Sequence, residues 1–94
     1  MCPNDIQYVD AYLLRSVAYQ RNGNYDLAIE DRTWLISVQP NNSLFYRDRG
    51  LLYAEKGDYE RTIKDYESAL EIEYQSSLHD ELEKFRKKLK AKKK

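Results

Sequence analysis

The chain has 94 residues, which suffice for one small domain or for part of a longer array of repeats. Hydrophobic residues make up 41% and charged residues 34%, and 16 Lys and Arg residues balance 16 Asp and Glu residues to a formal net charge of zero. This balance argues against a uniformly basic nucleic-acid-binding protein and against an acidic tail, and no run approaches the roughly 18 apolar residues of a membrane-spanning helix.

Four helices are predicted in the first three-quarters of the chain, each with apolar residues at helical spacing. The turns after the first and third helices contain Gly23 and Gly57, which can adopt the positive φ that ends a helix. The residue after each glycine, Asn24 or Asp58, can cap the next helix. Residues 39–43 form another stop-and-cap segment. The expected helices span about 5–21, 25–38, 43–55 and 59–74.

A fifth, amphipathic helix is expected over residues 77–94. Its apolar residues form one stripe, Leu78, Leu82, Phe85 and Leu89, and its other faces are charged. Such a helix suits the end of a stacked array. No Gly or Pro separates it from the fourth helix, so one continuous rod is an alternative. A rod would expose the apolar stripe, which favours a bend near residues 75–77 or a partner chain.

The first four helices form an internal repeat. A shift of 34 positions places residues 9–42 on residues 43–76. Each unit then reads as an apolar-periodic segment, a turn with glycine and a second apolar-periodic segment. The identical pairs are Tyr12/Tyr46, Arg15/Arg49, Tyr19/Tyr53, Gly23/Gly57, Tyr25/Tyr59, Ile29/Ile63 and Asp31/Asp65.

A 34-residue helix–turn–helix unit of this kind resembles the tetratricopeptide repeat. The first unit supplies family residues at Tyr12, Tyr19, Ala28 and Pro40, and the second unit at Tyr46, Gly50, Tyr53, Tyr66 and Ala69. The departures are Arg32, Leu35 and Tyr74, where the family usually has an aromatic, a small residue and proline. The resemblance implies an all-α fold: a solenoid fragment of two hairpins in residues 1–76, capped by the C-terminal amphipathic helix in residues 77–94.

The resemblance also implies a concave groove lined by the first helix of each unit. The expected partner-binding residues are Asp10, Leu13, Val17, Gln20, Arg21, Leu44, Arg47, Leu51, Ala54 and Glu55. Family members that clamp a terminal carboxylate have Lys or Asn at positions that here hold Leu13, Val17 and Asp48. A carboxylate clamp of that type is therefore not expected, and a mainly apolar or mixed ligand is.

One arginine–aspartate pair recurs in both units, on a face that is expected to be mostly buried. An unpaired buried charge is costly, so each arginine should have a carboxylate partner. We expect Arg15 to pair with Asp31 and Arg49 with Asp65, each within one hairpin. Arginine stays protonated at neutral pH, which suits a structural ion pair better than acid–base catalysis.

No catalytic or metal-binding motif is evident, and neither an enzyme nor a cofactor is expected. The one histidine, His79, and the one cysteine, Cys2, lie near opposite ends of the chain. A nucleophile–base pair or a typical zinc site would need such residues together. The glycines are too few and too scattered for a phosphate-binding loop.

Protein–protein interaction through the groove is the expected function, with a protein or peptide as partner. Self-association is the first alternative, because two repeats are fewer than the three usually needed for stability. The charge is also divided, with −5 over residues 1–75 and +5 over residues 76–94. The Lys-rich tail offers a third possibility, an anionic partner such as RNA or an acidic surface. The N-terminus shows no secretory signal, so a cytoplasmic location is expected.

Overall fold

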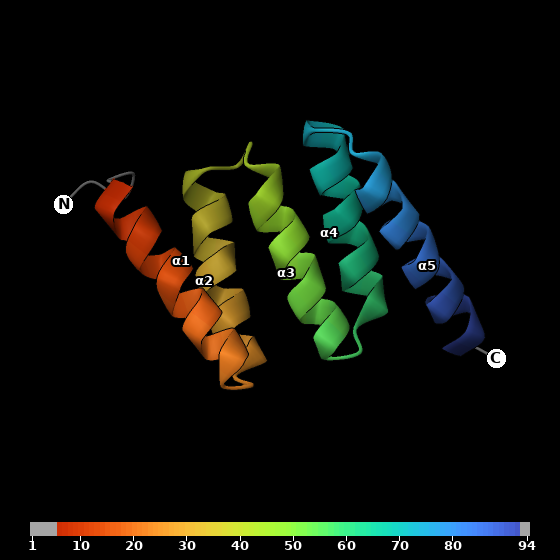
Figure 1. The fold of residues 1–94 in the computed structure, drawn as a ribbon, viewed down its shortest axis with the longest axis horizontal. Coiled ribbons are helices and arrows are strands. Elements are labelled where there is room, and N and C mark those ends of the chain that lie inside the picture. Colours follow the sequence, from red (N-terminus) through yellow and green to blue (C-terminus); the bar gives the residue numbers. More distant parts are fainter. Residues whose placement is uncertain (1–5, 93–94) are drawn as a thin grey trace.

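The computed structural model describes residues 6–92 and contains five helices (Figure 1). They are α1 (Ile6–Arg21), α2 (Tyr25–Val38), α3 (Ser43–Glu55), α4 (Tyr59–Ile72) and α5 (Ser76–Lys92). No strand occurs within the described residues, so the all-α expectation is confirmed. The expected start of the first helix, near residue 5, lies outside the described residues.

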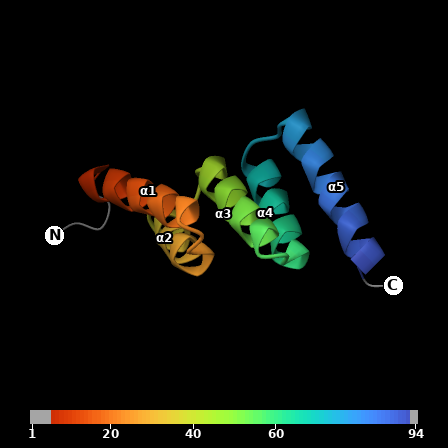
Figure 2. The ribbon, with the colours of Figure 1, turned by 60° about the horizontal axis from the view of Figure 1, so that its bottom comes forward.

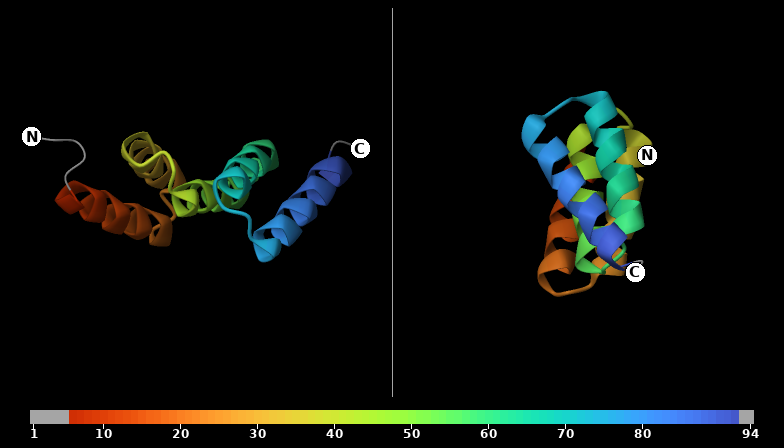
Figure 3. Two further views of the ribbon diagram at one scale, coloured as in Figure 1. Left: turned by 90° about the horizontal axis from the view of Figure 1, so that it is seen from above. Right: turned by 90° about the vertical axis from the view of Figure 1, so that its right-hand side faces the viewer.

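The helices stack in chain order, each against the next, in an elongated body of 49 × 29 × 17 Å. Helices α1, α3 and α5 form one layer, and α2 and α4 form the layer behind it (Figures 2 and 3). Because each helix packs mainly on its sequence neighbours, α1 and α5 lie at opposite ends of the body (Figure 1). This arrangement is a solenoid of helical hairpins.

Each hairpin turn is built around a glycine with positive φ. Gly23 has φ 79° and Gly57 has φ 85°. The N–H groups of Asn24 and Asp58, the residues after the two glycines, donate to carbonyl oxygens of the preceding helices at 2.8 and 2.9 Å. These hydrogen bonds satisfy carbonyls at the helix ends. Asp58 also caps α4 by accepting a hydrogen bond from the Arg61 N–H. The Asn24 side chain, by contrast, makes no cap hydrogen bond, so the prediction that Asn24 caps the second helix is wrong.

The chain bends between α4 and α5, over residues 73–75. Helix α4 ends at Ile72, two residues before the expected end at Tyr74, because Glu73 takes an extended backbone with φ −150° and ψ 114°. The Gln75 carbonyl then accepts the His79 N–H and starts α5, which begins at Ser76. The two helices are therefore separate, and no glycine or proline is needed to separate them.

Three apolar clusters hold successive helices together. The first contains Leu35 and Phe45, and the second joins Ala28 and Ile29 of α2 to Leu52 of α3. The third packs Leu78 and Leu82 of α5 against Tyr66 and Ala69 of α4. The apolar stripe of α5 is therefore covered by the preceding hairpin rather than left in solvent.

Candidate partner-binding face

Arginine–aspartate pairs connect the helices within both hairpins. The Arg15 guanidinium donates to the Asp31 carboxylate at 2.6 and 2.9 Å, and Arg49 donates to Asp65 at 2.7 and 2.8 Å. The hydrogen bonds to Asp65 raise the pKa of Arg49. Both pairs are bidentate, a geometry that fixes the angle between two helices as well as contributing energy.

A third pair, between Arg32 and Asp48, joins the first hairpin to the second. The Arg32 Nη1 lies 3.0 Å from the Asp48 Oδ2, and the Arg32 side chain is almost fully buried. Burial lowers the pKa of Arg32, although Asp48 opposes this effect. Sequence reasoning missed this pair, but a signal was present. Residues 15, 32 and 49 are arginines at intervals of 17, and each has an aspartate 16 positions later.

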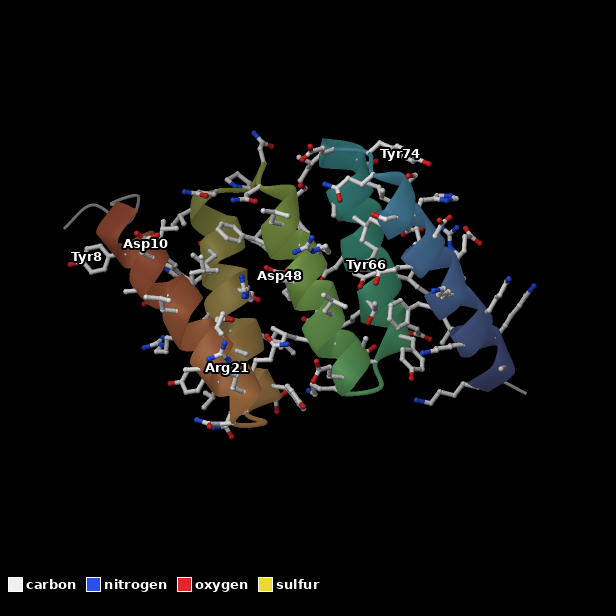
Figure 4. The ribbon with its side chains drawn as sticks, viewed as in Figure 1. Tyr8, Asp10, Arg21, Asp48, Tyr66 and Tyr74 are labelled. Carbon is white, nitrogen blue, oxygen red and sulfur yellow. The ribbon has the colours of Figure 1, made fainter. Side chains whose placement is uncertain are left out.

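The ten expected groove residues lie on α1 and α3, in the layer that also contains α5. We call this surface the α1/α3 face. Leu44, Asp10, Arg21 and Glu55 are exposed, whereas the other members are partly buried. Asp10 and Arg21 lie near opposite ends of α1 (Figure 4). The face therefore presents both apolar and charged groups to solvent.

Apolar side chains occupy much of the α1/α3 face. Leu13 packs against the first cluster and Leu51 against the cluster that includes α5, so both are partly covered. Leu44 is 46% exposed. Leu14, absent from the expected set, is 71% exposed, and its spacing of four residues from Asp10 puts it on the same side of α1. That spacing was the signal that could have found it.

One polar contact crosses the α1/α3 face, and a second lies within α3. The Gln20 amide of α1 donates to the Glu55 carboxylate of α3 at 3.4 Å, which links the ends of the two helices. Nearer the middle, the Arg47 Nη2 donates to the Asp48 Oδ1 at 3.1 Å. Arg47 remains 36% exposed and is thus a cation available to a ligand.

Several charged residues of the basic helix α5 contact the second hairpin of the same chain. Arg86 pairs with Glu67 of α4 at 2.8 Å, and Lys92 donates to the Gly57 carbonyl at 3.1 Å. The Lys92 ammonium also lies 5.4 Å from the centre of the Tyr59 ring. Part of the charge difference between the two parts of the chain is therefore balanced within the molecule.

The described residues offer little to acid–base or metal chemistry. His79 lies on α5, 4.0 Å from Glu83 and beside the Tyr74 ring, while Cys2 lies outside the described residues. Over residues 6–92, His, Cys, Asp and Glu side chains form no group of three that could hold a metal ion. Within the same range, each helix is too short or too polar to cross a membrane.

Comparison with known proteins identifies the same repeats. A family model described as "Tetratricopeptide repeat" matches residues 9–42 and 46–76, more than half of the chain. The chain is also similar to small glutamine-rich tetratricopeptide repeat-containing protein 2 of Saccharomyces cerevisiae, with 36% identity over 52 residues. This match covers 55% of the chain and 15% of the yeast protein. The likeness therefore concerns a small part of that longer protein.

Proposed function

The chain belongs to the tetratricopeptide repeat family, and we propose that it binds a segment of a partner protein along the α1/α3 face. Proteins of this family are generally non-catalytic modules for protein–protein interaction, and that general function applies to this chain. The observation that carries the finer proposal is the exposure of Leu14 and Leu44 on this face. Because both side chains are so exposed, neither is needed to hold the hairpins together, and both are available to a partner.

Leu14 gives a direct test, because it is exposed and its replacement should leave the fold intact. We expect a peptide array to yield binders, and Leu14→Asp to weaken them at least tenfold, as a charge in a desolvated contact costs about 1.4 kcal/mol or more. Leu27→Asp is the matched control, since Leu27 is also exposed but lies on α2 in the other layer. Binders that survive Leu14→Asp, or are lost equally in Leu27→Asp, would show that the α1/α3 face is not the site.

Self-association is the competing proposal, and light scattering separates the two. A monomer at micromolar concentration supports a surface free for another protein. A dimer that dissociates on Leu14→Asp would instead assign the same face to a second copy. The contacts of Arg86 and Lys92 with the chain's own hairpins favour the monomer, because they use part of the charge that would attract a second copy.

An anionic partner for the Lys-rich tail is the third proposal. Lys84, Lys87 and Lys90 are exposed on α5 and have no ion-pair partner within residues 6–92. If they bind RNA, the affinity should fall steeply as the salt concentration rises. Absence of binding even at low salt would dismiss this proposal.

A further inference from the structure

Arg32 is a buried cation with incomplete compensation. It occupies the position in the first repeat that Tyr66 occupies in the second. Its Nη1 is close to Asp48, but neither Nη1 nor Nε makes a hydrogen bond of good geometry with any described residue. A buried guanidinium with unsatisfied N–H groups gains from a carboxylate that can turn fully toward it.

Asp48 cannot serve Arg32 alone, because Arg47 shares it. One carboxylate oxygen faces Arg32 at 3.0 Å and the other faces Arg47 at 3.1 Å. Two guanidinium groups on one carboxylate leave one positive charge in excess. The Arg47 Nε is also buried without a hydrogen-bond partner among the described residues, although the side chain as a whole is partly open to solvent.

A third unsatisfied group, the Tyr66 hydroxyl, lies close to this cluster. It is fully buried, has no hydrogen-bond partner within the described residues, and feels the charges of Glu81, Arg47 and Asp48. The ring is held against Gly50, where a Cβ would come within 2.9 Å of it. Figure 4 labels Asp48 on α3 and Tyr66 on α4. Because Asp48 pairs with Arg32 of α2 and the Tyr66 ring lies against Gly50, the unsatisfied groups lie where α3 meets α2 and α4.

We propose that Arg47 binds an acidic side chain of the partner segment, and that this releases Asp48 to pair with Arg32. This inference rests on the proposed function, since it assigns ligand chemistry to the α1/α3 face. Arg47 is the solvent-accessible cation of the cluster, and the excess positive charge makes a carboxylate the complementary ligand.

The arginine Nε–H signals of the ¹⁵N-labelled protein report this contact without a known partner. The probe is N-acetyl-glutamate methylamide, and its control is N-acetyl-glutamine methylamide at the same ionic strength. We expect only the acid to shift the Arg47 and Arg32 signals, with half-saturation at about tens of millimolar, as for one partly exposed charge pair. Equal shifts with both compounds, or no shift with either, would overturn the inference.

Three variants sharpen the result. Arg47→Gln should abolish the response at Arg32, whereas Arg47→Lys should keep a weaker one because it retains the charge. Arg61→Gln is the matched control, since Arg61 is an exposed arginine of α4, outside the α1/α3 face, and it should leave the response unchanged. A response that survives Arg47→Gln contradicts the proposed contact.

The test of the Arg47 contact can fail or succeed independently of the test of partner binding. If array peptides bind and require Leu14 while the acidic probe leaves Arg47 unmoved, the face binds a partner but this acidic contact is wrong. If the probe shifts Arg47 and Arg32 as expected while no peptide binds, the anion site stands and the partner segment does not.

Discussion

The two repeats contain the same arginine–aspartate pair in different surroundings. Arg15 of the first repeat is 53% exposed, whereas Arg49 of the second is 19% exposed. The difference comes from α2, which packs on α3 and lets the Thr33 hydroxyl accept a hydrogen bond from Arg49 at 3.2 Å. None of the described helices covers the equivalent side of α1. Identical residues thus contribute differently according to whether a neighbouring hairpin is present.

The apolar residues of the two repeats also differ according to whether a neighbouring helix packs on them. Phe45 and Leu52 of α3 are buried against α2. The equivalent residues of α1 are Ala11 and Ala18, which are exposed. At these two positions the uncovered side of α1 therefore exposes little apolar surface, although Leu14, the counterpart of Asp48, is exposed beside them. The covered side of α3 contains large residues that fill the junction.

The largest expected effect tests the covered side. Leu52→Ala should lower the free energy of unfolding by about 3 kcal/mol, because it leaves a cavity between α2 and α3. Ala18→Leu, at the equivalent position of α1, should change it by less than about 0.5 kcal/mol. Urea unfolding followed by circular dichroism measures both. A cost above about 1 kcal/mol for Ala18→Leu would mean that another chain covers α1 in solution.

Breaking the ion pairs should show a smaller difference in the same direction, with the larger loss of unfolding free energy in the second repeat. Asp65→Ala leaves Arg49 mostly buried without its carboxylate, and we expect a loss of about 2–3 kcal/mol, reduced from a fully buried pair by the remaining exposure. Asp31→Ala should cost clearly less, since water can hydrate the half-exposed Arg15. The same urea titrations compare the two variants. Equal losses would contradict the role assigned to α2.

The sequence predicts local features of this fold better than contacts between hairpins. The glycine turns follow from two residues with positive φ, and the paired charges within each hairpin follow from their repetition. The end of α4 does not, because Glu73 turns the chain without a glycine or proline. Arg32 appears in the sequence only as a departure from the family pattern, and its partner Asp48 belongs to the next unit.

The expected face was likewise only partly readable from the sequence. Family positions indicated which residues of α1 and α3 share a side, but not how far each is covered. Leu51 packs against the cluster that contains residues of α5, which depends on the bend at residues 73–75, close to the expected position near residues 75–77. Leu14 is the most exposed large apolar residue of α1 in the described structure, and helical spacing alone puts it on this face.

The smallest expected effect concerns Tyr66, which takes the place of Arg32 in the second repeat. Its hydroxyl is buried without a hydrogen-bond partner in the described structure, so Tyr66→Phe should raise the free energy of unfolding by about 1 kcal/mol at neutral pH.

Burial also raises the pKa of Tyr66 above its ordinary value of 10.0. The folded chain then keeps this proton above pH 10 while the unfolded chain releases it, so the wild type loses stability as the pH rises. The advantage of Tyr66→Phe should therefore widen above pH 10, by up to about 1.4 kcal/mol per pH unit. Urea titrations of both proteins at neutral and alkaline pH measure this gap. A destabilised Tyr66→Phe, or a stability gap that stays constant with pH, would mean that the Tyr66 hydroxyl has a hydrogen-bond partner in solution. The second repeat would then satisfy its buried polar group, whereas in the first repeat Arg32 shares the Asp48 carboxylate with Arg47.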